Sequence, residues 1–389
     1  MNLLPLAFIK NRLPRAFEKM EYGTLTFTTP EGETRVYQGH QPGPNATFVL
    51  HDWAVIGSLI ARGDIGLGET YIEGRWESAD IEHLVALFLL NLEHLEHFAH
   101  GNWFNRRIFG LYNYIVRRNS RKGSRSNIKA HYDVGNDFYK LWLDETMTYS
   151  SALYEGTDDL ATAQRNKYQR ILSKLTTPNA EILEIGCGWG GFAEAAASAR
   201  HALTGITISP SQYGFAKQRV GGKADIRLQD YRDTHGAFDM IASIEMFEAV
   251  GMRYWPDYFA TIRKNLKHGG SAVVQTITVR DEDFDDYRKR SDFIRHYVFP
   301  GGMLPSVKTF SDAAAKEGLA TREVFAFGQD YARTLREWLV RFDAAREPIL
   351  AMGYSEAFIR NWRFYLAICA SAFSIGRTNV VQVELSHAA

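Results

Sequence analysis

A carboxylate and a run of glycines stand close together between positions 181 and 191, where the sequence reads EILEIGCGWGG. The glycines at 186, 188 and 190 leave the backbone open to a bulky ligand, because a Cβ there would collide with it. A helix expected to begin near Phe192 would offer its free N–H groups at the same place. Glu184 ends the preceding strand, within reach of a cationic or hydroxyl-bearing group. This combination predicts a binding site for a nucleotide-like cofactor.

The spacing of acidic residues helps to choose the cofactor. Dinucleotide-binding turns carry an acid about 20 positions further on, which hydrogen-bonds the ribose. Here no Asp or Glu lies between Glu194 and Asp225. S-adenosyl-L-methionine fits better, since a carboxylate suits its ammonium group and small glycines leave room for its methionine tail. NAD or FAD is the alternative.

The segments around this turn alternate between strand and helix patterns. Strands are predicted at 181–186, 202–207, 224–229, 239–244 and 271–277, with helices at 190–199, 210–220 and 254–267. Such alternation is typical of a parallel sheet with helices on both faces. Further on, the patterns predict helices at 309–318, 331–350 and 355–373, a final strand at 378–385, and a charged insert at 280–295 that we interpret as a lid.

The N-terminal part has a different character. β-like pieces at 25–28, 35–38 and 47–50 precede helical periodicity from Ile81 to Phe98. Eight Lys or Arg residues and no acid follow between Gly101 and Tyr132. We predict an N-terminal α+β domain at 1–118, a basic linker at 119–130 and a catalytic domain at 131–389.

Composition sets further bounds. The chain has 389 residues, 45% of them hydrophobic, which is enough for two cores. Its formal net charge is zero, so composition does not indicate nucleic-acid binding. Its two cysteines, Cys187 and Cys369, provide neither a disulfide framework nor a metal-ligand cluster. The sequence has neither an apolar run of membrane-spanning length nor a cleavable signal pattern, so we expect a cytoplasmic protein that contacts the inner membrane face.

A long segment from His131 to Tyr154 carries a specific resemblance. It reads HYDVGNDFYKLWLDETMTYSSALY, and the glycine turn, Asp230-Tyr231, Glu245-Met246-Phe247-Glu248 and the segment 365–384 follow in order. Together these motifs resemble the cyclopropane fatty acid synthase family, which includes the mycolic acid methyltransferases. The resemblance covers roughly residues 125–389 and implies an α/β class I methyltransferase fold, with a Rossmann-like, doubly wound mixed sheet. The preceding residues resemble, more weakly, the lipid-associated domain of longer bacterial members.

The resemblance implies methyl transfer from S-adenosyl-L-methionine to the cis double bond of an unsaturated acyl chain in a membrane phospholipid. An alkene is a weak nucleophile, so donor and acceptor must be aligned with water excluded. The resulting carbocation can be stabilised by aromatic faces, each by roughly 0.5–2 kcal/mol. The candidate rings are those of Tyr149, Tyr154, Phe247, Tyr297 and Tyr331. For each of them, ordinary packing in the core is the alternative.

A base must then remove a proton. Family members are thought to use a bound bicarbonate, held by Glu, Tyr, His and Cys side chains. Glu248 matches the Glu and Tyr331 the Tyr, whereas Ser151 replaces the Cys and Gln275 replaces the His. Glu245 stands where many members have Gly, and a second carboxylate would raise the pKa of one of the pair. Either the anion is held more weakly or Glu248 acts alone, and both a cyclopropane and a ring-free branched product stay open.

The resemblance also implies how the methyl donor is held. Side chains are expected to contact the methionine end of the cofactor, and the backbone of the glycine turn to lie beneath it. Neutral hydrogen-bonding side chains are expected at the ribose, and two further residues at the adenine edge. The candidates are Tyr132, Ser150, Glu184, Gly186, Cys187, Gly188, Thr207, Ser209, Gln212, Asp230 and Tyr231. Thr207 and Ser209 are alternatively strand-end and helix-cap residues. Cys369 matches a cysteine sometimes assigned as nucleophile, but direct transfer needs no covalent intermediate, and its apolar helix favours packing.

The partners follow from charge and chemistry. The basic linker is predicted to contact anionic lipid headgroups, where each cation contributes on the order of 1 kcal/mol; a solvated linker is the alternative. No nucleic-acid-binding fold accompanies this charge. The sequence leaves a homodimer open. Two other classes compete: a methyltransferase of a soluble small molecule, and a non-catalytic lipid-binding protein that kept the fold.

Overall fold

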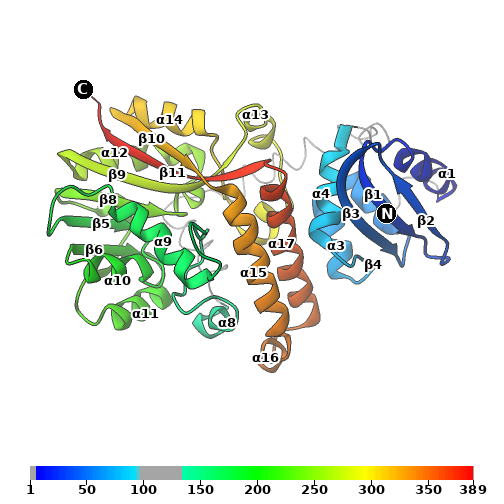
Figure 1. Cartoon of the computed structure of the whole chain (residues 1–389), viewed down its shortest axis with the longest axis horizontal. Helices are drawn as coiled ribbons and strands as arrows, with labels where there is room; N and C mark the ends of the chain where they lie inside the picture. The colour runs from blue at the N-terminus through cyan, green and yellow to red at the C-terminus, as the bar shows by residue number, and fades with distance from the viewer. Residues whose placement is uncertain (1–5, 94, 96–133, 389) are drawn as a thin grey trace.

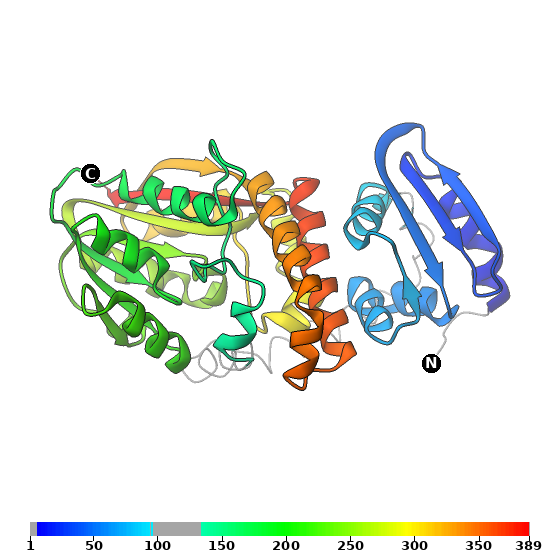
Figure 2. The same ribbon diagram turned by 60° about the horizontal axis from the view of Figure 1, so that its bottom comes forward.

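The computed structural model describes residues 6–93, 95 and 134–388. Two sheets lie at opposite ends of the molecule, with a pair of long helices, α15 (Gly328–Ala344) and α17 (Glu356–Ser374), between them (Figures 1 and 2). The predicted linker at 119–130 and the boundary at 118 fall outside the described residues, so the domain limits stay predictions. None of the helices in the described ranges is both long and apolar enough to cross a membrane.

The larger sheet has seven strands in the order β10-β11-β9-β8-β5-β6-β7. Its strands are β5 (Glu181–Ile185), β6 (Ala202–Thr207), β7 (Asp225–Leu228), β8 (Phe238–Ile244), β9 (Leu266–Val279), β10 (Leu319–Ala326) and β11 (Thr378–His387). The five strands from β5 to β9 pair in parallel, whereas β11 runs antiparallel to both β9 and β10. This arrangement confirms the class I methyltransferase fold with a mixed sheet.

Strand β10 was missed by the sequence patterns. It lies at the sheet edge, and most of its residues are exposed or half-buried. An edge strand with one covered face lacks the continuous apolar run that marks a central strand.

Alternating side chains of the central strands build two separate cores. Ile182 and Met240 belong to the cluster on one face of the sheet, whereas their neighbours Leu183 and Ile241 belong to the cluster on the other face. This period of two follows from strand geometry and covers both faces of the sheet. The covering helices are α9 (Leu160–Leu172), α10 (Gly191–Ser198), α11 (Pro210–Val220), α12 (Trp255–Asn265) and α14 (Val307–Lys316).

The helices between the sheets pack against each other. They are α15 (Gly328–Ala344) and α17 (Glu356–Ser374), joined through α16 (Arg346–Ala351). The prediction of one continuous helix at 331–350 is therefore wrong. The chain leaves helical geometry at Ala345, and a separate short helix follows. The charged insert forms α13 (Phe284–Tyr287) and the π-helix η4 (Ile294–Val298).

The N-terminal part forms a four-stranded sheet in the order β2-β1-β3-β4. Its elements are α1 (Leu6–Phe17), β1 (Tyr22–Thr28), β2 (Thr34–Gln38), β3 (Gln41–Leu50), α2 (Ala54–Arg62), α3 (Asp64–Ile72), β4 (Trp76–Glu77) and α4 (Ile81–Leu90). The predicted strands are present within β1, β2 and β3, but helices α1 to α3 were not predicted. Helix α4 is shorter than the predicted 81–98, part of which lies outside the described residues.

The two parts share one apolar core. The ring of Phe364 in α17 packs 4.8 Å from Phe293, 5.8 Å from Tyr71 and 6.3 Å from Trp76, measured between centroids. Arg360 also donates hydrogen bonds to the carbonyl oxygens of Tyr71 and Trp76. The N-terminal elements therefore pack on α17, whose opposite side borders the cavity described below.

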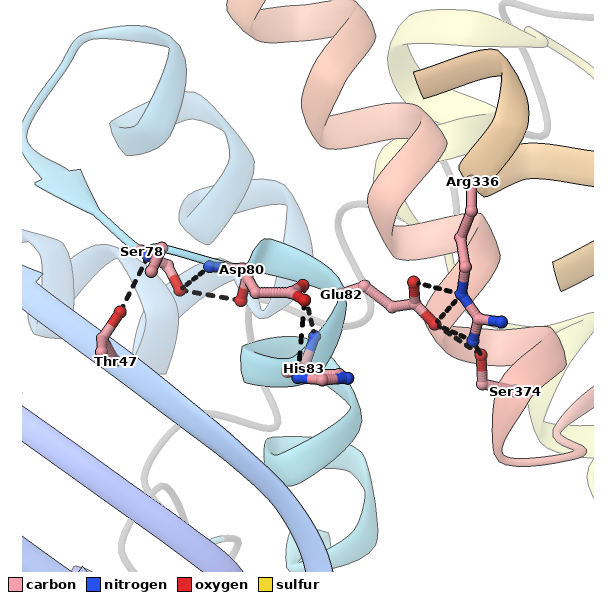
Figure 3. Close-up of polar contacts among 8 residues, drawn as sticks. Thr47, Ser78, Asp80, Glu82, His83, Arg336 and Ser374 are labelled. Atoms are coloured by element: carbon pink, nitrogen blue, oxygen red, sulfur yellow. Dashed lines mark hydrogen bonds and ion pairs between the residues drawn. The ribbon is translucent and has the colours of Figure 1, made fainter. Parts of the chain in front are cut away.

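A polar contact reinforces this junction (Figure 3). The carboxylate of Glu82, in α4, accepts hydrogen bonds from Arg336 Nη2 at 2.6 Å and Nε at 2.9 Å, and from Ser374 Oγ at 2.6 Å. Burial of Glu82 opposes ionisation, but the bonds from Arg336 and Ser374 outweigh it and lower the pKa of this carboxyl.

Replacing Glu82 with Ala is expected to lower the free energy of unfolding by about 1–2 kcal/mol. The penalty is limited because the Arg336 side chain is 50% exposed and can be solvated once its partner is lost. Urea unfolding measures the change. Glu73→Ala, which removes an exposed ion pair to Arg75, is the control, and equal losses in the two variants would rule out a special role for Glu82.

Candidate active site

A cavity of about 370 Å³ opens at the carboxyl ends of β5, β6 and β8. One part is lined by the glycine turn and the residues that follow β6 and β7. The other part is lined mainly by apolar and aromatic residues of the charged insert, the following loop and helices α15 and α17, together with Asp292 and Arg295 of the insert. Glu245 and Glu248 also line it, after the end of β8. Polar and apolar halves thus meet at two carboxylates.

The glycine turn has the backbone that its sequence predicted. Gly186, Gly188 and Gly190 all have positive φ angles, between 52° and 84°. At Gly186 a Cβ would also lie 2.7 Å from the Met246 side chain. A side chain here would both strain the backbone and clash, so the turn requires glycine.

Glu184 presents an unused acceptor to the cavity. Its Oε2 is buried and has no hydrogen-bond partner among the described residues. Burial raises the pKa of Glu184 to about 8. A buried carboxylate oxygen without a donor is costly unless a ligand supplies one. The site therefore fits the ammonium or hydroxyl groups of S-adenosyl-L-methionine.

The other predicted cofactor residues divide into three groups. Those that line the cavity are Ser150, Gly186, Cys187, Gly188, Thr207, Gln212, Asp230 and Tyr231. Ser209 is not among the lining residues; its hydroxyl accepts from the Gln212 N–H and caps α11, which supports the alternative interpretation of this residue. Tyr132 lies outside the described residues.

Several of the lining residues are already engaged by neighbours. Thr207 Oγ1 donates to Gln212 Oε1 at 3.0 Å. Asp230 accepts two hydrogen bonds from the guanidinium of Arg232, at 2.7 and 2.9 Å. These contacts fix the side chains before any ligand arrives.

Glu248 combines a fixed and an unpartnered oxygen. It lies in the short helix η2 (Phe247–Ala249), and its Oε1 accepts from the Ile277 N–H at 2.6 Å and from Thr276 Oγ1 at 3.0 Å. Its Oε2 is buried without a partner among the described residues. Burial, and then the nearby charge of Glu245, raise the pKa of Glu248 to about 8.

Glu245 is the residue around which three predicted side-chain positions converge. Its Oε1 accepts from the Ser151 N–H and from Gln275 Nε2, both at 2.8 Å, and its Oε2 accepts from the Tyr331 hydroxyl at 2.6 Å. Ser151 and Gln275 are fully buried beneath Glu245 and do not line the cavity. The sequence shows an unusual carboxylate at Glu245, but not that these three donors converge on it.

These donors do not fit an added bicarbonate. Tyr331, Ser151 and Gln275 are the positions at which the anion was expected, and all three already donate to the Glu245 carboxylate. These three positions therefore have no free donors left to hold a bicarbonate.

Lys167 was missed by the sequence analysis. It is completely buried in α9, and its Nζ donates to Ser150 Oγ at 2.6 Å. Burial lowers the pKa of Lys167 to about 7, although the charges of Glu245 and Asp144 oppose this shift. A signal was available, because positions 160, 163, 164, 167, 168 and 171 are all buried and form one helical stripe.

The aromatic residues predicted to stabilise the carbocation differ in whether they line the cavity. Tyr149 and Tyr331 line the cavity, whereas Tyr154 and Phe247 do not, and Tyr297 is 42% exposed away from it. Rings that sequence reasoning missed come from the insert, the loop after it and α17: Tyr287, Phe299, Tyr365 and Phe373. Only the packing of the insert, the loop after it and α17 around the cavity reveals them.

Cys369 lines the cavity from α17. Burial raises the pKa of its thiol, so the thiolate needed for nucleophilic attack is disfavoured. This environment favours packing over a nucleophilic role.

Fold and site together define a class I methyltransferase that uses S-adenosyl-L-methionine. Residues 119–383 match the family model described as mycolic acid cyclopropane synthetase. The chain belongs to this family.

Relatives agree with this assignment. The chain is 37% identical over 332 residues to a cyclopropane-fatty-acyl-phospholipid synthase of Escherichia coli, covering 84% of each chain. It is 34% identical over 361 residues to a tuberculostearic acid methyltransferase of Mycobacterium tuberculosis, covering 88% of this chain and 84% of the relative. The crystal structure of a mycolic acid cyclopropane synthase complexed with S-adenosylhomocysteine matches with a TM-score of 0.63 and 30% identity, over 67% of this chain and 97% of that one. The protein is thus an enzyme of fatty acid modification.

Proposed function

We propose that this enzyme methylates the double bond of unsaturated acyl chains in membrane phospholipids. The observation that carries the proposal is a cavity in which a cofactor turn, two buried carboxylates and a largely apolar lining meet. A polar metabolite would leave the apolar half without a matching group, which disfavours a soluble substrate.

The chain's own residues divide the work of the first step. The glycine turn and Glu184 hold the methyl donor, which when bound supplies an electrophilic methyl group. Apolar residues such as Ile294, Phe299 and Leu304 hold the hydrocarbon and exclude water. Alignment and dryness matter because an alkene competes poorly with water for an electrophile.

The second step needs negative charge and a proton acceptor. The rings of Tyr149, Tyr331 and Tyr365 border the cavity, where each can stabilise a carbocation by roughly 0.5–2 kcal/mol. Burial raises the pKa of Glu248, and a cation that develops beside its unpartnered Oε2 favours the ionised carboxylate, which then stabilises that cation. Loss of a proton then gives either a ring or a double bond.

A ring-free branched product is the second candidate. It is favoured because Ser151, Gln275 and Tyr331, the positions expected to hold bicarbonate, donate to Glu245 instead, so the proton acceptor differs from the one expected for ring closure. The similarity to a tuberculostearic acid methyltransferase supports the same outcome.

The phospholipid substrate and the location at the inner membrane face belong to this proposal. They are supported by similarity to a fatty-acyl-phospholipid synthase. The basic segment predicted to contact anionic headgroups lies outside the described residues.

Expression in a bacterial host that lacks its own lipid-modifying enzyme tests the proposal. Mass spectrometry of fatty acid methyl esters should show unsaturated chains heavier by one CH₂ group, because a methyl enters and a proton leaves. Fragmentation or NMR then separates ring from branch. An unchanged lipid profile in cells that contain folded, cofactor-binding protein would refute the proposal.

A further inference from the structure

The donors around Glu245 form an anion site that the chain fills itself. An amide N–H, a side-chain amide and a phenol, from Ser151, Gln275 and Tyr331, all point to one carboxylate. These three donors come from segments far apart in the sequence. Such convergence on a group that lines the reaction cavity indicates a position held for chemistry.

Surrounding contacts fix each donor in advance. Gln382 Nε2 donates to Gln275 Oε1 at 3.1 Å, so the amide nitrogen of Gln275 must face Glu245. The Ser151 hydroxyl donates to the Ala152 carbonyl, which leaves the Ser151 N–H as the donor to the carboxylate. The buried Lys167 adds an attractive positive charge.

The backbone conformation of Glu245 is also unusual. Its φ is +49°, in the left-handed region that favours glycine. A charged side chain held in an unfavourable backbone conformation, directly beside a cavity, points to a function. The same angle means that a glycine would be accommodated without strain.

We propose that Glu245 is the proton acceptor of the methylation and takes the place of bicarbonate. The inference rests on the proposed function. In the step, a C–H bond of the carbocation breaks, and its electron pair remains on carbon to form the ring bond or the double bond. The proton passes to Oε2 of Glu245, which has a lone pair left beside the Tyr331 hydroxyl. The resulting neutral acid releases the proton to solvent after the product leaves.

The test compares wild type, Glu245→Gly and Glu245→Gln in buffer freed of carbon dioxide, with and without added bicarbonate. Wild type should form product at the same rate in both. Glu245→Gly should lose about 10²–10⁴-fold in rate without bicarbonate, as expected for a lost general base, and recover at least about tenfold with it. Glu245→Gln should stay inactive in both, since the amide fills the site but accepts no proton.

Two results would overturn the proposal. One is a wild-type rate that rises about tenfold with bicarbonate, and the other is a Glu245→Gly variant that keeps its rate in bicarbonate-free buffer. Circular dichroism and S-adenosylhomocysteine affinity verify that both variants fold.

A binding measurement separates this inference from the proposed function. The NMR signal of ¹³C-labelled bicarbonate should broaden with Glu245→Gly but not with wild type. If wild type yields no methylated lipid, the proposed function fails, and this binding contrast still supports the self-filled anion site. Equal binding to both proteins refutes that site.

Discussion

Replacing Glu248 with Gln should reduce product formation by about 10²–10⁴-fold and leave cofactor affinity nearly unchanged. The amide oxygen of Gln can still accept from the Ile277 N–H and Thr276, so the local fold is retained. What is lost is the ability of the cavity-lining Glu248 to ionise when a positive charge develops beside its unpartnered oxygen. Rates with an unsaturated phospholipid, together with calorimetric titration of S-adenosylhomocysteine, measure the two effects.

Glu282→Gln provides the matched control for this prediction. Glu282 lies on the charged insert, and its side chain is 67% exposed. The same chemical change there should leave the rate as it is. Turnover of Glu248→Gln within about twofold of wild type, far below the expected loss, would remove Glu248 from the mechanism.

Replacing Glu184 with Gln should weaken binding of S-adenosyl-L-methionine by about 10–100-fold, equivalent to a charge-assisted hydrogen bond. The buried Oε2 of Glu184 has no donor within the described part of the chain, so a ligand is its expected partner. Titration calorimetry of wild type and variant gives the difference directly.

The same substitution should stabilise the ligand-free enzyme. Burial raises the pKa of Glu184 to about 8 from a reference of 4.5. A raised carboxyl pKa means that the folded state binds the proton more tightly, so this group removes stability as pH rises from about 4.5 to about 8. Glu184→Gln lacks this loss, and its melting temperature should exceed that of wild type by more at pH 8 than at pH 5.

Glu181→Gln controls for this pair of effects. Glu181 begins the same strand, but its side chain is 60% exposed and pairs with Lys267. Neither cofactor affinity nor the pH dependence of stability should change. A Glu184→Gln variant that binds the cofactor as wild type does would place the ligand's charged end elsewhere.

The site places two carboxylates in opposite environments. Glu245 accepts three hydrogen bonds and is attracted by the charge of Lys167, whereas Glu248 keeps one oxygen without a partner among the described residues. Different environments for neighbouring acids allow each to take a separate role in one reaction. Here the better-supported carboxylate is assigned to proton removal, and the other to stabilising positive charge.

Local patterns in the sequence were sufficient for the cofactor turn and the central sheet. Positive φ at Gly186, Gly188 and Gly190, the Ser209 cap and the alternation of Leu183 with Ile182 all depend on neighbouring residues. Such features are set by backbone sterics and side-chain period, which a sequence displays directly. The edge strand β10 lacked that period and was missed.

The acid–base centre depends on contacts that no local pattern contains. Glu245 meets Ser151, Gln275 and Tyr331 only because strands β8 and β9 and helix α15 converge there. The amino-acid order therefore specified the fold, the methyl-donor turn and the chemistry available. Packing of distant segments determined which carboxylate is fixed by three hydrogen-bond donors beside the cavity, because hydrogen bonds depend on proximity in space and not on proximity along the chain.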